Sequence, residues 1–195
     1  QAGEAGGIVI PMKRPLSVLL VLALAAPLAA LPPAPGASPQ AAVTVKEVEP
    51  FPYCAVVHKG PITDMAAVIG QLIGAMQTQG LFPQIRGPMV GVYYEAPGEV
   101  AAQELNWEVG FIITAQAAPQ PPLVKKTWEH RTVAAALHVG PYAKAPETIK
   151  AVSDWLAARG YEADGPILER YLDMNPAAVK PEELRTEIWV PCRKK

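Results

Sequence analysis

The stretch His138-Val-Gly-Pro-Tyr142 lies where an apolar strand pattern ends and a helical pattern begins. An earlier stretch, His58-Lys-Gly-Pro61, has the same form, and its histidine lies 80 positions before His138. Gly80 and Gly160 each follow a helical pattern and are also 80 positions apart. A signal that recurs at a fixed spacing indicates a repeated structural unit. We therefore predict two similar halves, and any ligand site would most naturally lie between them.

Each half shows the same order of strand and helix patterns. The first half has strand patterns near residues 43–48, 53–59, 89–94 and 107–114 and a helical pattern at 63–79. The second half has strand patterns at 123–128, 131–138, 167–172 and 185–190 and a helical pattern at 146–159. One helix on a small sheet buries too little apolar surface to stabilise about seventy residues. We therefore expect the halves to pool their sheets in one α+β fold with a groove between them.

Residues 12–30 have the pattern of a signal peptide for export. Lys13 and Arg14 supply the positive start, residues 16–26 are apolar except for Ser17, and small residues follow. This is the order of an export signal, and the apolar run is short for a membrane span. We therefore expect a secreted or periplasmic protein with no stable membrane span after the leader is removed. An uncleaved N-terminal anchor is the alternative.

The other boundaries follow from composition. Residues 1–11 precede the first methionine and are interpreted as an upstream or expression-derived segment. Residues 31–42 are rich in Pro and Ala without periodicity, which is typical of an extended linker. The predicted domain occupies residues 43–192, with half one at 43–115 and half two at 123–192.

The composition suits one globular domain. The chain has 195 residues, of which 50% are hydrophobic and 18% charged, with a formal net charge of −1. With 17 basic and 18 acidic residues, no charged surface is indicated that would attract nucleic acid, so we expect no nucleic-acid partner. The three histidines lack metal-ligand spacing, and no phosphate-binding glycine loop occurs. We therefore expect no metal and no cofactor.

Cys54 and Cys192 are the two cysteines of the chain. Each falls in an apolar strand pattern, one early in the first half and one at the end of the second. An oxidising compartment would permit a disulfide between them. Two buried free thiols are the alternative, and the residue pattern does not choose between the two.

The last predicted strand holds the most informative acid. Alternation places Arg185, Glu187 and Trp189 on one face. Tyr171, on the preceding strand, could approach the same surface. A carboxylate beside aromatic rings attracts a cationic or planar ligand, and apolar walls raise a carboxyl pKa toward values useful for acid–base chemistry. The alternative is that Glu187 pairs with Arg185 or Lys125 on a solvated face.

Further candidates lie around this strand. Trp107-Glu108 is the first-half counterpart, but its two side chains point to opposite faces. Glu169 lies two residues before Tyr171 and shares its face. Tyr142 could reach the cleft between the halves. Of these residues, Trp107 and Tyr142 join Glu187, Tyr171 and Trp189 in the candidate site.

As an ordered set, the motifs of this chain resemble the GyrI-like, or bacterial effector-binding, domain family, which includes AraC-type effector-binding domains. The second-half motifs that carry the resemblance are His138-Val-Gly-Pro-Tyr142, Asp154-Trp-Leu-Ala-Ala-Arg-Gly160, Gly165-Pro-Ile-Leu-Glu-Arg-Tyr-Leu172 and Thr186-Glu-Ile-Trp-Val-Pro191. The first-half motifs are His58-Lys-Gly-Pro61 and Gly91-Val-Tyr-Tyr-Glu-Ala-Pro97. The resemblance covers approximately residues 43–192.

The resemblance implies a duplicated strand–helix–strand–strand fold, with an antiparallel sheet and a ligand cleft between the halves. Members of the family occur as sensing domains of multidrug-responsive regulators, as gyrase-modulating proteins and as hydrolases of cyclopropane-bearing genotoxins. The family's cleft acid maps by motif to Glu187, with Tyr171 and Trp189 as an aromatic wall. Tyr94 and Trp107 map to further wall positions.

Two departures from the family narrow the function. No helix–turn–helix pattern precedes the domain in this sequence, and an export signal would separate the protein from gyrase. We therefore expect an exported, stand-alone protein that captures hydrophobic or cationic small molecules. A second hypothesis is a hydrolase that detoxifies electrophilic cyclopropanoids, in which Glu187 positions or deprotonates water and Tyr171 assists. A third is a protein-interaction module of the cell envelope, which requires an apolar patch and a filled cleft.

Overall fold

The computed structural model describes residues 42–95 and 99–195. The predicted signal peptide at 12–30, the segment before it and nearly all of the Pro/Ala linker therefore lie outside the described residues. Within the described ranges, no helix is both long and apolar enough to cross a membrane.

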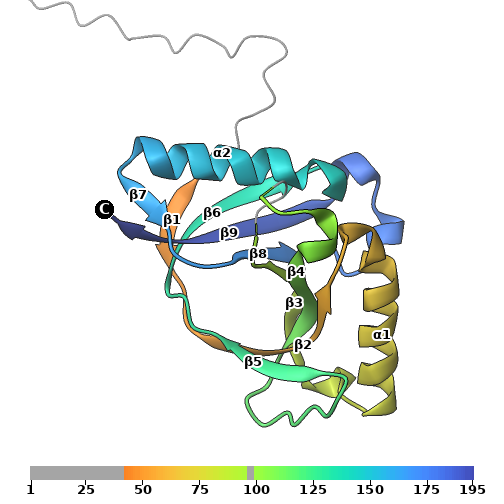
Figure 1. Cartoon of the computed structure of the whole chain (residues 1–195). Coiled ribbons are helices and arrows are strands. Elements are labelled where there is room, and N and C mark those ends of the chain that lie inside the picture. The colour runs from red at the N-terminus through yellow and green to blue at the C-terminus, as the bar shows by residue number, and fades with distance from the viewer. Residues whose placement is uncertain (1–41, 96–98) are drawn as a thin grey trace, which may run out of the picture. The chain divides into compact units, whose positions relative to one another are not determined.

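The described residues form an α+β fold built on one antiparallel sheet (Figure 1). The elements of the first half are β1 (Thr44–Glu47), β2 (Phe51–Lys59), α1 (Met65–Thr78), β3 (Ile85–Tyr93) and β4 (Asn106–Ile113). The elements of the second half are β5 (Val124–Trp128), β6 (Thr132–Val139), α2 (Ala145–Ala158), β7 (Tyr161–Ala163), β8 (Ile167–Tyr171) and β9 (Arg185–Lys194). Every predicted strand and helix is present near its predicted position, and β7 is an additional short strand.

The strand order across the sheet is symmetrical about its centre. The order is β1-β6-β9-β8-β3-β4-β2-β5, and β7 pairs with β9 outside this path. Outward from the central β3–β8 pair, the first half contributes β3-β4-β2 and the second half contributes β8-β9-β6. At the edges the halves exchange strands, because β1 pairs with β6 and β5 pairs with β2. This is the arrangement that a duplicated unit would take, although a common origin of the halves stays a prediction.

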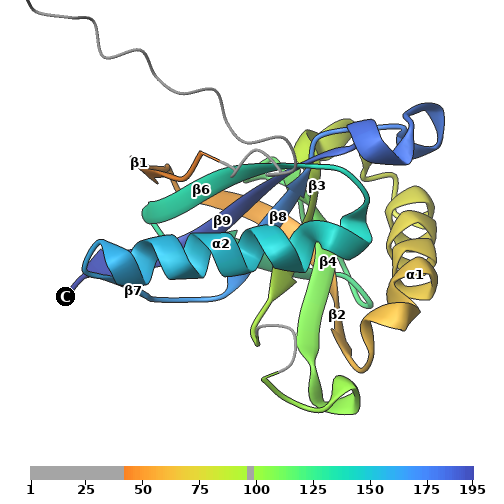
Figure 2. The same cartoon turned by 90° about the horizontal axis from the view of Figure 1, so that it is seen from above.

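Each helix follows a Gly-Pro turn and ends at a glycine with positive φ. Gly80 has φ 64° and Gly160 has φ 72°, a left-handed conformation that glycine adopts without the steric cost that other residues pay. Helix α1 packs against β2 and β4, and α2 packs against β6, β7 and β9. The two helices therefore pack on strands of different halves, and they lie apart from each other in Figure 2.

The apolar core has three clusters, two beneath the helices and one on the opposite face of the sheet. On the opposite face, the ring of Phe51 lies 6.3 Å from Trp128 and 6.2 Å from Trp189. Four strand steps separate β2, which carries Phe51, from β9, which carries Trp189. Those steps would span about 19 Å in a flat sheet. The sheet therefore curves around this third cluster, and the helices lie on its outer face.

Both cysteines are buried free thiols. Cys54 belongs to the cluster beneath α1 and Cys192 to the cluster beneath α2. The disulfide alternative is therefore not formed. Burial raises the pKa of both thiols, which lowers their reactivity.

Candidate functional site: an acidic pocket at the centre of the sheet

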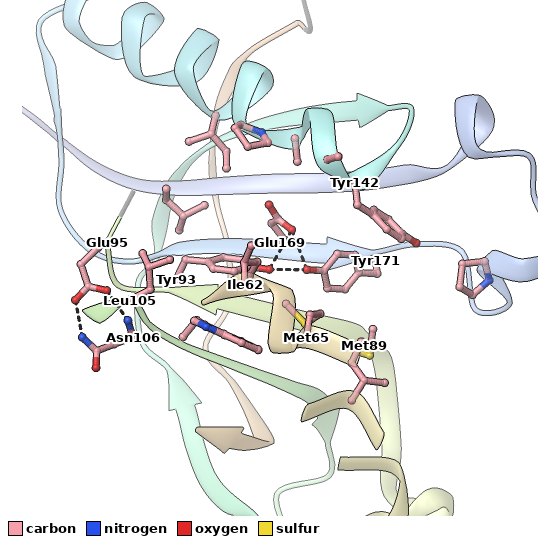
Figure 3. Close-up of a pocket in the computed structure, with 18 residues that line it drawn as sticks. Ile62, Met65, Met89, Tyr93, Glu95, Leu105, Asn106, Tyr142, Glu169 and Tyr171 are labelled. Carbon is pink, nitrogen blue, oxygen red and sulfur yellow. Dashed lines mark hydrogen bonds between the residues drawn. The ribbon is translucent and has the colours of Figure 1, made fainter. Parts of the chain in front are cut away.

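A pocket of about 560 Å³ opens over the β3–β8 pair, between the beginnings of the two helices (Figure 3). Its floor comes from β3, β4 and β8. Its walls come from the first turns of α1 and α2 and from the short 3-10 turns that precede them. Most of the lining is apolar or aromatic, including Ile62, Met65, Met89, Leu105, Ile149 and Ile167. The predicted cleft between the halves is therefore present.

Glu169 is the buried acid of this pocket, with only 7% of its surface exposed. Tyr171 Oη donates a hydrogen bond of 2.8 Å to Glu169 Oε2, and Tyr93 Oη lies 3.5 Å from the same oxygen. The two tyrosine hydroxyls are themselves 2.8 Å apart. The hydrogen bonds to this carboxylate among the described residues all go to Oε2, so Oε1 is the oxygen left for a ligand.

No basic side chain neutralises Glu169 within the described part of the pocket, because no lining residue there is Lys, Arg or His. Burial raises the pKa of Glu169, and hydrogen bonds from Tyr171 and Tyr93 offset only part of that effect. Burial also raises the pKa of both tyrosines, which therefore remain neutral hydrogen-bond donors. An ionised Glu169 in this setting is stabilised chiefly when a cation enters the pocket.

Gly91 makes room for the hydroxyl pair. It lies directly opposite Glu169 in the β3–β8 pairing. A Cβ atom at this position would lie 2.8 Å from Tyr171 Oη and 2.9 Å from Tyr93 Oη. Such contacts are too short for a methyl group, so a glycine is needed for both tyrosines to reach the carboxylate.

Trp107 and Tyr142 form aromatic walls of the pocket. The indole Nε1 of Trp107 donates a hydrogen bond of 2.9 Å to the carbonyl of Gly60, which fixes the ring against the Gly-Pro turn. The ring of Tyr142 meets that of Tyr171 edge to face, with centroids 5.4 Å apart at 79°. Tyr142 is 36% exposed, so it lies at the mouth of the pocket.

Glu187 and Trp189 do not line this pocket, contrary to the prediction from the sequence. In the β8–β9 pairing, Tyr171 lies opposite Thr186 and Arg170 lies opposite Glu187. Because directly paired residues share a face, Glu187 lies on the other side of the sheet from Tyr171. Both the grouping of Glu187 with Tyr171 and the assignment of Trp189 to the same aromatic wall are therefore wrong for this structure.

On the opposite face, Glu187 forms ion pairs with Lys46 and Arg170. Both cations also lie over the indole of Trp189, each 4.6 Å from the ring centroid. The alternative of an ion-paired Glu187 is thus the one observed, although its partners differ from the expected Arg185 and Lys125. Because Lys46 and Arg170 already neutralise the Glu187 carboxylate, it is poorly suited to bind a cationic ligand.

Tyr94 also lies on the opposite face. Its hydroxyl donates a 3.2 Å hydrogen bond to Glu108, a fully buried carboxylate that also binds Tyr53 and Lys126. The neighbouring Tyr93 occupies the pocket instead. The prediction for this strand therefore chose the wrong one of two adjacent tyrosines, and adjacent residues of a strand point to opposite faces of the sheet.

The structure thus brings together three predicted residues, Tyr171, Trp107 and Tyr142, and adds Glu169 and Tyr93. The sequence contained a signal for Glu169, since it shares the face of Tyr171 two positions away. Tyr93 would have followed from the repeat, because it lies 78 positions before Tyr171, the spacing that also separates Gly87-Pro88 from Gly165-Pro166. Within the described ranges, no group of three potential ligands is placed to hold a metal ion.

The class of protein is defined by three features: an antiparallel sheet, two helices on one face of it, and between the helices an apolar pocket that holds a buried carboxylate. These are the features of a small-molecule-binding α+β domain. The chain belongs to the family described as the GyrI-like small molecule binding domain, whose model matches residues 41–193. The resemblance drawn from the sequence motifs is thereby confirmed.

Solved structures show the same fold at low sequence identity. The C-terminal domain of EcmrR has a TM-score of 0.70 at 15% identity, over 80% of this chain and 99% of that one. A hydrolase encoded by lin2189 from Listeria innocua has a TM-score of 0.61 at 14% identity, over 80% and 94% of the two chains. SAV2435, solved bound to tetraphenylphosphonium, has a TM-score of 0.57 at 11% identity, over 78% and 94%. A search of curated proteins by sequence finds no match.

Proposed function

We propose that this domain binds a hydrophobic cation in the central pocket, with Glu169 as the counter-charge. The observation that carries the proposal is a buried carboxylate, among apolar and aromatic side chains, with no basic side chain among the described lining residues. An unpaired buried charge is costly, and a cation that enters the pocket removes much of that cost. The faces of Trp107 and Tyr142 would add cation–π attraction. SAV2435, which shares the fold, was solved with such a cation.

The proposal includes action outside the cytoplasm. It is supported by the export pattern at residues 12–30, where Lys13 and Arg14 precede an apolar run and small residues. A binding protein in that compartment would capture the compound before it reaches the cytoplasm.

The test is a titration with tetraphenylphosphonium followed by tryptophan fluorescence, because Trp107 lines the pocket. We expect Glu169→Gln to weaken binding by about tenfold or more, since a desolvated charge interaction is worth about 2 kcal/mol. Glu187→Gln is the matched control and should bind as the wild type does, because Glu187 lies on the other face. Equal affinities of wild type and Glu169→Gln would exclude the proposed counter-charge.

A hydrolase is the second candidate, and it is favoured by the hydrogen-bonded series from Tyr93 through Tyr171 to Glu169. A carboxyl group with a raised pKa beside a hydroxyl donor could activate water and protonate a leaving group. A hydrolase from Listeria innocua shares the fold. The pocket is open at about 560 Å³, so it does not support the third hypothesis, which requires a filled cleft.

Turnover separates hydrolysis from binding. The protein would be incubated with an electrophilic cyclopropanoid and the mixture searched for a product that has gained water. If the site is catalytic, Glu169→Gln should abolish the product and Tyr171→Phe should slow its formation by about 100-fold, the usual scale for one acid–base group. Saturable binding without any product would leave only the binding function.

A further inference from the structure

A second carboxylate, Glu95, lies at the end of the pocket away from the tyrosine pair (Figure 3). Alternation along β3 and beyond its end places Met89, Gly91, Tyr93 and Glu95 on the pocket side of the sheet. The first of these positions is paired with Tyr171 and the second with Glu169. Glu95 therefore extends the row of residues that forms the pocket floor.

Asn106 holds the Glu95 carboxylate at both oxygens. The backbone N–H of Asn106 donates to Oε2 at 2.8 Å, and its side-chain Nδ2 donates to Oε1 at 2.8 Å. Hydrogen bonds from Asn106 lower the pKa of Glu95, so this group stays ionised at neutral pH. The nearby cation Lys59 is already paired, at 2.5 Å, with Glu104. The carboxylate is thus fixed and charged before any ligand arrives.

The spacing of the two acids can be read from the strand. Glu95 is four residues beyond Gly91, which lies opposite Glu169. At about 3.3 Å per residue, four residues of extended chain place the backbone of Glu95 about 13 Å along the pocket floor from the position opposite Glu169. The side chains of Tyr93, Leu105 and Ile167 line the pocket with them. The pocket therefore offers two anionic positions with an apolar surface between them.

We propose that the pocket accepts an elongated dication, with one cationic centre at Glu169, the other at Glu95, and an apolar spacer between them. The inference rests on the proposed function for its first anchor and adds the second anchor and the length of the ligand. A monocation occupies only the buried position. A dication whose spacer is too short leaves Glu95 unoccupied.

The probes are decamethonium, the shorter dication hexamethonium, and decyltrimethylammonium, which has one cationic end. Binding of each would be measured by calorimetry at low ionic strength, where exposed charges are least screened. We expect Glu95→Gln to weaken decamethonium binding by about two- to fivefold, the range for a partly exposed ion pair. Binding of decyltrimethylammonium and of hexamethonium should not change.

Glu187→Gln is the matched control, because Glu187 lies on the other face of the sheet and does not line the pocket. It should leave all three affinities unchanged. Asn106→Ala frees the Glu95 carboxylate and should cause a smaller loss for decamethonium alone. An unchanged decamethonium affinity in Glu95→Gln, or an equal loss for all three probes, would overturn the second anchor. If instead Glu169→Gln bound decyltrimethylammonium as tightly as the wild type, the proposed function itself would fail.

Discussion

Glu169 and Glu187 lie on neighbouring strands but in opposite electrostatic settings. Glu187 has Lys46 and Arg170 as partners, whereas Glu169 has two neutral tyrosine hydroxyls. A hydroxyl can donate a hydrogen bond to a carboxylate but cannot cancel its charge. At the scale of single residues, the unneutralised acid, rather than the acid beside the tryptophan, is the one suited to a ligand.

This contrast predicts how stability depends on pH. Burial raises the pKa of Glu169 above its ordinary value of 4.5. The stability associated with its neutral form is therefore complete below that value and is lost as the pH rises through the folded-state pKa. Glu169→Gln has no charge to bury, so we expect it to melt above the wild type at about pH 8. Each kcal/mol of difference in the free energy of unfolding should separate the melting temperatures of the variant and the wild type by about 2–4 °C. This separation should shrink as the pH is lowered toward about 4.

Glu187→Gln provides the opposite case. Burial alone would raise the pKa of Glu187, but the hydrogen bond from Lys46 and the charge of Arg170 hold it below its ordinary value. Its ionised form stabilises the fold above the unfolded pKa, and this contribution is lost as the pH falls through the folded value. The glutamine variant should therefore melt below the wild type near neutral pH. If the melting temperatures of Glu169→Gln and Glu187→Gln, each relative to the wild type, changed with pH in the same direction, the buried unpaired state of Glu169 and the ion-paired state of Glu187 would be contradicted.

Sequence reasoning located some site residues and not others for a definite reason. Tyr171, Trp107 and Tyr142 were recognised because each belongs to a local motif. The error at Glu187 arose because the pairing of β8 with β9 decides whether Glu187 and Tyr171 lie on the same face of the sheet. That register is a long-range property, and a displacement of one residue moves a side chain to the other face.

At the scale of elements, the two edge strands place equivalent ion pairs on the face opposite the helices. Lys126 on β5 pairs with Glu108, and Lys46 on β1 pairs with Glu187. The lysines are 80 positions apart and the acids 79. The burial of the two pairs differs, because Glu108 is 0% exposed at its side chain and Glu187 is 20% exposed.

This difference predicts unequal costs for the same substitution. Lys126→Met would leave Glu108 buried without its cation, so we expect a loss of about 3 kcal/mol in the free energy of unfolding. Lys46→Met leaves Glu187 paired with Arg170, and we expect a loss of less than about 1 kcal/mol. Urea unfolding would measure both. In the double variant Lys126→Met/Glu108→Gln, part of the loss should be recovered, and equal costs for the two lysines would argue against the difference in burial.

The positions of the elements were predictable because their ends carry local signals. Gly-Pro turns precede both helices, and Gly80 and Gly160 end them with positive φ. The short strand β7 had no such signal, since three residues are too few for a periodic pattern. The exchange of β1 and β5 between the halves was likewise not encoded in any local feature.

At the scale of the whole domain, the symmetry of the sheet determines where the pocket forms. The helices cover the outer strands of their own halves, so the central β3–β8 pair remains accessible. The repeat in the sequence was sufficient to predict a cleft between the halves. It could not predict which acid lies there, because the two halves differ at equivalent positions.

The central position of the pocket also bears on how its ligand range could change over time. One wall is encoded by a segment near Ile62 and Met65 and the other by a segment near Tyr142 and Ile149, about 80 codons apart. Substitutions in one segment alter one side of the bound compound and leave the contacts on the other side as they were. New specificities can therefore arise by substitutions on one wall at a time. Exchange of the first half between related genes would combine two pocket walls that each already function in a folded protein, with Glu169 kept in place.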